Sequence, residues 1–284
     1  MAKVGLVLSG GMVKGAYQIG VLKSLRKYIN ADSIECISTA SIGTLAGYAY
    51  LSDKLDIYEK LWLENESFNM RTFLRSTIKR SVILDKVSLL VDNNATISKD
   101  FFTALINMNK MSLDYTNLKS VDKNLLNSYF KASISFVPVF KTIEINKINY
   151  LDGALVDNIP VIPISKYDLD YIIIVHFDKN KYVYSDLKNK NVIEINFNTK
   201  TSISKSLSFD SESSQDMIQR GYAKAEEIFS DVFKKGTDNL KYIEERIENL
   251  NKNKIKEKYN MSGDIIVDRI NKVAKKLVKH NMKE

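Results

Sequence analysis

Ser41 is the residue whose neighbours best suit nucleophilic chemistry. An apolar-leaning run, Ile34 to Ile37, comes before it, and a helix-like run begins at Thr44. A serine at a sharp turn from a strand into a helix has the geometry of a nucleophile elbow, G-x-S-x-G, and the N-terminus of that helix favours negative charge at the serine. Gly43 fits this pattern, whereas Thr39 stands where the first glycine is usual and is stiff and β-branched. Such turns are common, so this segment alone also fits a purely structural turn.

A glycine-rich turn lies near the N-terminus and reads S-G-G-M-V-K-G from Ser9 to Gly15. It follows an expected buried strand at Val4 to Leu8 and precedes an expected helix at Ala16 to Tyr28. This arrangement commonly makes an anion site, because free backbone N–H groups and the helix N-terminus face the ligand. One use is an oxyanion hole, which needs only two or three convergent N–H groups near a nucleophile.

Three other interpretations of this turn stay open. Gly10 and Gly15 have the spacing of a phosphate-binding P-loop, but the Lys-Ser/Thr pair that should follow is absent. A dinucleotide fingerprint would need a glycine where Met12 stands, although Glu35 lies near the distance expected for a ribose-binding acid. The third interpretation is a plain glycine turn that lets a helix and a strand pack closely.

Asp152 is the acid best placed to act with Ser41. An Asp-Gly pair after an apolar run marks a turn, and it puts a carboxylate at a strand end. Asp157, the other nearby acid, lies in a D-N-I-P setting that is typical of turn chemistry. A serine needs a base, which is usually histidine. His280 lies in the charged tail, but His176 ends an expected strand, so it is either a third member of a hydrolase-like triad or a structural histidine. A carboxylate that acts directly on the serine is the simpler interpretation.

Taken together, three segments resemble the patatin-like phospholipase family. They are S-G-G-M-V-K-G-A-Y-Q-I-G-V-L from Ser9, T-A-S-I-G-T-L from Thr39 and D-G-A-L-V-D-N-I-P-V from Asp152. The family has a glycine-rich oxyanion loop followed by Arg or Lys, then a G-x-S-x-G elbow, then a D-G-[GA] turn. The resemblance covers about residues 4 to 230. It implies an α/β fold of three layers, with a mainly parallel central sheet flanked by helices.

The resemblance also implies a role for each matching position. Ser41 matches the nucleophile and Asp152 the base of a Ser–Asp dyad, which would cleave fatty-acyl esters of phospholipids or related lipids through an acyl-serine intermediate. Three positions match the loop whose backbone N–H groups bind the oxyanion: Gly10, Gly11 and Met12. Four more support the motifs: Lys14, Gly15, Gly43 and Gly153. No cofactor is implied, and no clustered His/Cys/Asp set has metal-ligand spacing.

Two positions depart from the family pattern. Met12 replaces a glycine of the oxyanion loop, where a glycine-only backbone angle would be strained, and Thr39 adds bulk beside the elbow. Either change could lower activity, although neither removes a catalytic side chain. A non-hydrolytic lipid-binding or regulatory relative is therefore the alternative function, and the retained Ser41 and Asp152 argue against it.

Composition and charge narrow the class of protein, its expected location in the cell and its expected partners. The chain has 284 residues, a formal net charge of +8 and a single cysteine, Cys36, which excludes an internal disulfide framework. No apolar run reaches the roughly 20 residues that span a bilayer, and we expect a cytoplasmic protein. Residues 234–284 hold 14 basic and 8 acidic residues, so 14 − 8 = +6 of the charge lies there. This excess predicts peripheral contact with anionic membranes, or else a solvated helix surface; we expect no nucleic acid partner.

The remaining elements organise the chain. Strands expected at Tyr171–Phe177 and Asn191–Phe197 alternate with helices, which indicates a largely parallel sheet. We expect an acyl hydrolase domain at residues 1–235, in which residues 53–130 form a helical insertion or lid, and a basic, amphipathic helical extension at residues 236–284. Within these parts we expect helices at Leu55–Phe68, Ser98–Asn107 and Ser211–Lys235, a strand at Ala132–Phe140, a turn or short hairpin at Glu144–Tyr150, and two C-terminal helices around Leu240–Leu250 and Ile266–Leu277.

Overall fold

The computed structural model describes residues 2–64, 68–69, 77–92, 95–136, 140–178, 184–187, 190–197 and 208–256. Its strands are β1 (Val4–Leu8), β2 (Ile34–Thr39), β3 (Phe68–Asn69), β4 (Asp100–Asn107), β5 (Ser112–Asn117), β6 (Ile143–Ile145), β7 (Ile148–Asp152), β8 (Tyr171–His176), β9 (Asn191–Asn196) and β10 (Ser208–Phe209). Its α-helices are α1 (Gly15–Leu25), α2 (Ile42–Leu51), α3 (Leu55–Leu63), α5 (Thr77–Leu90), α6 (Lys123–Ser133), α7 (Ile162–Ser165), α8 (Ser211–Val232) and α9 (Leu240–Lys256).

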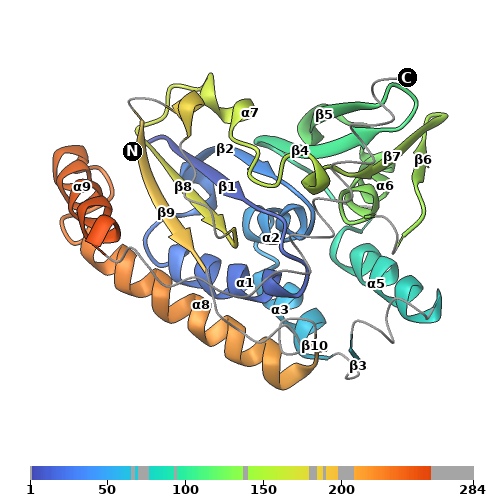
Figure 1. Ribbon diagram of the computed structural model, residues 1–284, viewed down its shortest axis with the longest axis horizontal. Coiled ribbons are helices and arrows are strands. Elements are labelled where there is room, and N and C mark those ends of the chain that lie inside the picture. Colours follow the sequence, from blue (N-terminus) through green and yellow to red (C-terminus); the bar gives the residue numbers. More distant parts are fainter. Residues whose placement is uncertain are drawn as a thin grey trace.

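A mainly parallel sheet occupies the centre of the molecule (Figure 1). Its order is β6-β7-β4-β2-β1-β8-β9. Strands β2 and β7 pair with successive parts of one edge of β4, and β5 pairs with the opposite edge. Five neighbouring strands are parallel: β4, β2, β1, β8 and β9. Strands β5, β6 and β7 run antiparallel to their neighbours. Every residue of β1 and β8 is buried, as expected for strands covered on both faces. The predicted α/β fold with a mainly parallel sheet is confirmed.

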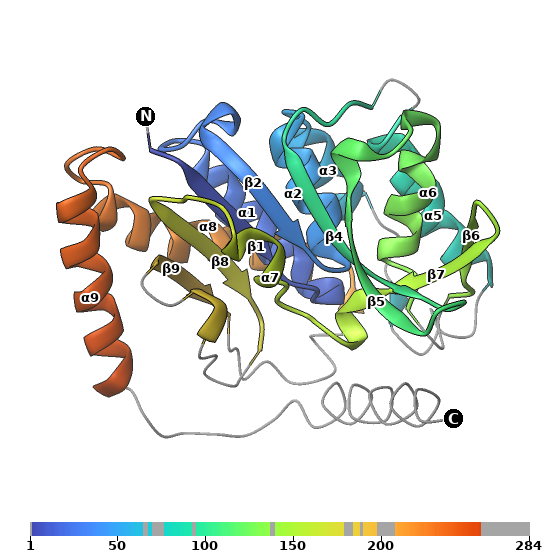
Figure 2. The ribbon, with the colours of Figure 1, turned by 90° about the horizontal axis from the view of Figure 1, so that it is seen from above.

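Two hydrophobic cores cover the two faces of this sheet. The larger core includes Leu6 and Leu8 of β1 together with side chains of α1, α2, α3, α8 and α9. The smaller core includes Val7 on the opposite face, with Ile164 of α7 and Leu169. Adjacent residues of β1 thus enter different cores because successive strand side chains point to opposite faces. In Figure 2, α1, α2 and α8 lie behind the strands, on one side of the sheet.

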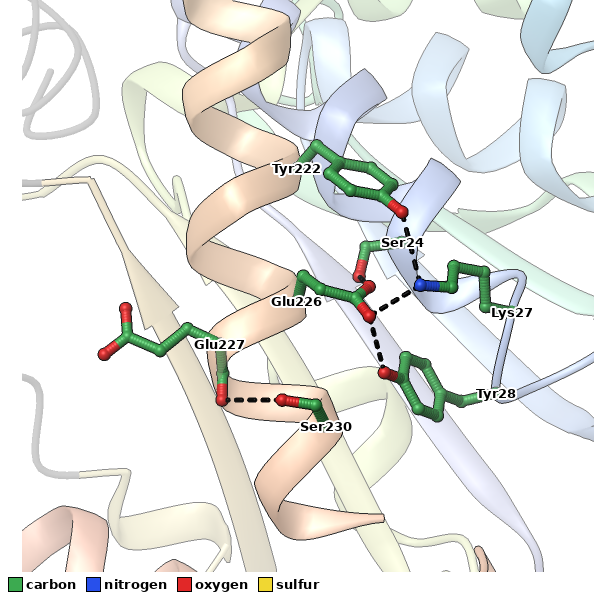
Figure 3. Close-up of polar contacts among 7 residues, drawn as sticks. All are labelled: Ser24, Lys27, Tyr28, Tyr222, Glu226, Glu227 and Ser230. Atoms are coloured by element: carbon green, nitrogen blue, oxygen red, sulfur yellow. Dashed lines mark hydrogen bonds and ion pairs between the residues drawn. The ribbon is translucent and has the colours of Figure 1, made fainter. Parts of the chain in front are cut away.

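Helices α1 and α8 contact each other without side chains between them at one point. A Cβ added at Gly20 would lie 2.0 Å from the Ile218 carbonyl oxygen, and one added at Gly221 would lie 2.2 Å from the Tyr17 carbonyl oxygen. Farther along the same interface, Glu226 accepts hydrogen bonds from Ser24, Lys27 and Tyr28 of α1 and the residues just after it, as the close-up shows (Figure 3). This contact attaches α8 to the first βα unit, which contains the glycine-rich turn.

Two expectations about secondary structure are wrong. Residues 98–107 were expected to form a helix, but β4 covers Asp100–Asn107 and lies inside the sheet. Seven of its eight residues are buried, and a short apolar run that is buried on both faces has no periodicity to separate strand from helix. The expected strand at residues 132–140 is also wrong: α6 extends to Ser133, and residues 134–136 are irregular. Residues 137–139 lie outside the described residues.

The expected helical insertion at residues 53–130 is therefore only partly helical. Helices α3, α5 and α6 lie there, but β4 and β5 belong to the central sheet. Other expectations are confirmed: the hairpin of β6 and β7, the strands β8 and β9, and the long helix α8.

Helix α9 packs on the main body through its apolar side. Ile243 is fully buried and Ile247 is 6% exposed, and both join the larger core. The first expected C-terminal helix is thus confirmed, whereas the second, around residues 266–277, lies outside the described residues. Among the helices that the structure describes, none is both long and apolar enough to cross a bilayer.

Candidate active site

Ser41 lies at a sharp turn between β2 and α2. Its backbone angles are φ 53° and ψ −131°, a sparsely populated combination for a residue other than glycine. The turn is held by hydrogen bonds from the Gly43 N–H to the Ala40 carbonyl (3.0 Å) and from the Thr44 N–H to the Ser41 carbonyl (2.9 Å). A Cβ added at Gly43 would lie 2.4 Å from the Leu8 carbonyl oxygen, so only glycine fits there. The geometry is that of the nucleophile elbow that the sequence predicts.

Strand β4 brings Asp152 to this serine. Strand β2 pairs with one edge of β4 up to Thr39, which lies opposite Thr103. Strand β5 occupies the other edge of β4, so β7 must pair along the same edge as β2. Strand β7 runs antiparallel to β4 and ends with Asp152 opposite Leu105. The ends of β2 and β7 therefore face each other two residues apart on β4, a distance of about 7 Å along that strand. Ser41 and Asp152 meet at this junction.

The carboxyl group of Asp152 is buried. The residue is 2% exposed, and its Oδ1 accepts a hydrogen bond from the Ala154 N–H at 2.9 Å. Burial raises the pKa of Asp152 to about 7, and interactions with the Ser41 side chain and the Ala154 N–H oppose that rise. A carboxyl group with a pKa near neutrality is suited to accept and release a proton at physiological pH.

The glycine-rich turn lies against Ser41 and against the turn that follows Asp152. A Cβ added at Gly10 would lie 2.9 Å from the Ser41 Cβ and 3.0 Å from the Ala154 Cβ, so the bare backbone of the turn approaches the serine. Met12 has φ 51°, which bears out the expectation that this position takes a glycine-like angle. Within the described part of the chain, the N–H groups of Gly10, Gly11 and Met12 have no acceptor. Of these three residues, Gly10 lies directly against Ser41.

Three further motif residues shape the site through packing. The N–H of Lys14 donates to the Gly11 carbonyl at 3.0 Å, which closes the turn before α1. A Cβ added at Gly15 would lie 2.7 Å from the Ile42 Cγ1, so Gly15 lets α1 start against the start of α2. A Cβ added at Gly153 would lie 2.4 Å from the backbone of Ala104, so Gly153 lets the turn after Asp152 cross β4.

The other candidate acids and bases have different partners. His176 is fully buried, and its Nε2 lies 2.8 Å from Oε1 of Glu194 on the neighbouring strand β9. This contact favours the interpretation of His176 as a structural strand-end histidine. Asp157 accepts hydrogen bonds from the Tyr115 hydroxyl at 2.6 Å and from the Ile159 N–H at 3.2 Å, in keeping with the expected turn role. His280 lies outside the described residues.

Two residues at the site were not singled out from the sequence. The Asn158 Oδ1 would lie 2.6 Å from a Cβ at Gly10, and its Nδ2 donates to Asp178 at 3.2 Å. The Phe177 ring would lie 2.4 Å from a Cβ at Gly11, so it packs directly on the glycine-rich turn. Asn158 belongs to the quoted D-N-I-P stretch, which could have drawn attention to it, but nothing local marks Phe177 as a neighbour of the turn.

In the part of the chain that the structure describes, no group of three or more His, Cys, Asp or Glu side chains could hold a metal ion. The chemistry available at the site is that of a hydroxyl, a carboxyl group and three backbone N–H groups.

Comparison with known proteins gives two findings. Residues 6–164 match the model of a family described as patatin-like phospholipase. Among solved structures, the chain is similar to the crystal structure of VipD from Legionella pneumophila, with a TM-score of 0.46 and 13% sequence identity. That match covers 80% of this chain and 66% of VipD, so this chain spans just under two thirds of that one.

Proposed function

Because this chain belongs to the patatin-like phospholipase family, which makes it a lipid hydrolase at the level of the family, we propose that it cleaves fatty-acyl esters of phospholipids or related lipids with a Ser41–Asp152 dyad. One observation carries the proposal: Ser41, at a strained elbow, interacts through its hydroxyl with a buried carboxyl group whose pKa is raised to about 7. A serine hydroxyl becomes a useful nucleophile only when a base can accept its proton.

In the acylation step, the Ser41 Oγ attacks the ester carbonyl carbon while its proton passes to Asp152. The carbonyl oxygen becomes an oxyanion, which the free N–H groups of Gly10, Gly11 and Met12 stabilise. The tetrahedral intermediate then collapses, the bond to the alcohol breaks, and the proton on Asp152 passes to the departing alkoxide. An acyl-serine remains. Loss of one oxyanion donor typically costs about 10²–10³ in rate.

In the deacylation step, water repeats the attack. Asp152 accepts a proton from water as the oxygen bonds to the acyl carbon, and the same N–H groups hold the second oxyanion. The Ser41 oxygen departs and takes the proton back, so the fatty acid leaves and the dyad returns to its first state. Burial of Asp152 supports this role because a pKa near neutrality lets the group both accept and donate a proton.

We also propose that the basic C-terminal region contacts anionic membranes. Of its +6 charge, residues 234–256 carry 7 − 4 = +3 and residues 257–284 carry 7 − 4 = +3. Truncation after residue 256 retains α9, whose Ile243 is part of the core, and should weaken sedimentation with anionic vesicles at low salt but not with neutral ones. Equal sedimentation of the full and truncated chains would remove this proposal.

A fatty-acid release assay tests the proposed hydrolase. Phospholipid and short-chain esters are offered to the native chain, to Ser41→Ala and to Asp152→Asn, with Asp157→Asn as the control for loss of a carboxylate from the same loop. We expect activity in the native chain and the control, and background rates in the two dyad variants. Labelling of Ser41 by a fluorophosphonate should follow the same pattern. A folded native chain that cleaves no ester and takes no label would favour the non-hydrolytic lipid-binding alternative.

A further inference from the structure

Three buried threonine hydroxyls join the serine elbow to the neighbouring strand. Thr39 is the last residue of β2, Thr44 is the third residue of α2 and Thr103 lies within β4; all three are fully buried. The Thr39 Oγ1 lies 2.9 Å from the Phe102 carbonyl oxygen and 3.0 Å from the Thr44 Oγ1, which lies 2.9 Å from the Thr103 Oγ1. We call these three side chains the hydroxyl chain.

The direction of the hydroxyl chain follows from the number of protons. Each hydroxyl has one proton, and a carbonyl oxygen can only accept, so the Thr39 proton goes to Phe102. Thr44 must therefore donate to Thr39, and Thr103 must donate to Thr44. All three protons are used. Loss of the Thr39 hydroxyl would leave the Thr44 proton and the Phe102 carbonyl without this partner in a buried place, where an unmet polar group is costly.

The hydroxyl chain lies at the junction where Ser41 meets Asp152. Thr39 is two residues before Ser41, and the Thr44 N–H bonds to the Ser41 carbonyl, so two members hold the elbow on either side of the serine. Thr103 and Phe102 belong to β4, the strand that also pairs with β7 at Leu105 and Asp152. The hydroxyl chain thus connects the turn that carries Ser41 to the strand that positions Asp152.

We propose that the hydroxyl chain positions Ser41 relative to Asp152, and that Thr39 thereby maintains the elbow at a place where the family pattern has glycine. Its catalytic consequence rests on the proposed hydrolase function. The extra bulk of Thr39 does not distort the turn, since Ser41 keeps an elbow backbone and Thr39 is wholly buried against β4. Glycine at this position would remove the link to β4 and add backbone freedom. Thr39→Gly should therefore lower activity instead of restoring a better elbow.

The test compares Thr39→Ser, Thr39→Val and Thr39→Gly with the native chain. Ser keeps the hydroxyl, Val keeps the shape without the hydroxyl, and Gly removes both. The control is Ser133→Ala, which deletes another fully buried hydroxyl that donates to a backbone carbonyl, that of Phe130 at 2.8 Å. The turnover rate is measured per site that a fluorophosphonate can titrate. Hydrogen–deuterium exchange of the Gly43 and Thr44 amides, relative to amides of β8, reports the elbow without any substrate.

We expect Thr39→Val and Thr39→Gly to lower kcat per site by about tenfold with KM unchanged, and to speed local exchange at Gly43 and Thr44 by a similar factor. Thr39→Ser should stay close to the native chain, and Ser133→Ala should change neither kcat per site nor the ratio of exchange rates. Native kcat with unchanged elbow exchange in Thr39→Gly would overturn the inference. If the native chain proves to hydrolyse no ester, the proposed function fails separately, and the exchange rates still decide whether the hydroxyl chain holds the elbow.

Discussion

Replacement of Asp152 by asparagine should stabilise the folded protein, by an amount that depends on pH. The pKa of this carboxyl is 3.8 when exposed and about 7 in the folded chain, a rise of about 3 units caused first by burial. Between these values the folded state keeps a proton that the unfolded chain has lost, so the free energy of unfolding falls as pH rises from about 4 to 7. At 1.36 kcal/mol per unit, ionised Asp152 destabilises the fold by up to about 4 kcal/mol above pH 7.

Asparagine keeps an oxygen that can accept the Ala154 N–H but carries no charge at any pH. Asp152→Asn should therefore match the native chain near pH 4 and exceed its unfolding free energy by up to about 4 kcal/mol near pH 8. Urea titrations across this range measure the difference, and Asp157→Asn controls for loss of a carboxylate that has polar partners in Tyr115 and Ile159. A difference that stays flat with pH, or that reverses its sign, would refute the assignment of a buried, destabilising carboxylate.

Four further predictions concern the pH dependence of hydrolysis, His176, Cys36 and the contact between α1 and α8. Ester hydrolysis should rise with pH through about 7 as Asp152 ionises, and a rate that does not change across this range would argue for another base. His176→Gln should keep this rise and most of kcat; its loss would put His176 into the mechanism. Cys36 is fully buried with its pKa raised to about 12, so a thiol reagent should react only on unfolding, and rapid labelling of the native chain would contradict its burial. Gly221→Ala should lower the free energy of unfolding by about 1–3 kcal/mol, because its Cβ would meet the Tyr17 carbonyl oxygen; unchanged urea midpoints would show that α8 shifts freely.

The sequence determined the local features of the site. The strand, the small-residue turn and the helix around Ser41 are encoded within a few residues, because the apolar run, the small turn residues and the helix-like run follow one another directly. The family resemblance also drew attention to Met12, which stands where a glycine is usual, and its φ of 51° lies in the region that favours glycine. Strands that are buried on both faces, such as β1 and β8, were readable as continuous apolar runs.

Only the tertiary structure decided how these pieces meet. The sequence of β4 was expected to form a helix, because a short apolar run that is buried on both faces has no periodicity to separate strand from helix. Yet this strand sets the separation of Ser41 and Asp152. From the sequence, Thr39 was expected only to add bulk beside the elbow. Its hydrogen-bond partners, the Phe102 carbonyl and Thr44, come together around it only when β2 pairs with β4. The raised pKa of Asp152 also depends on the tertiary structure, because the strands and turns around a residue decide how deeply it is buried.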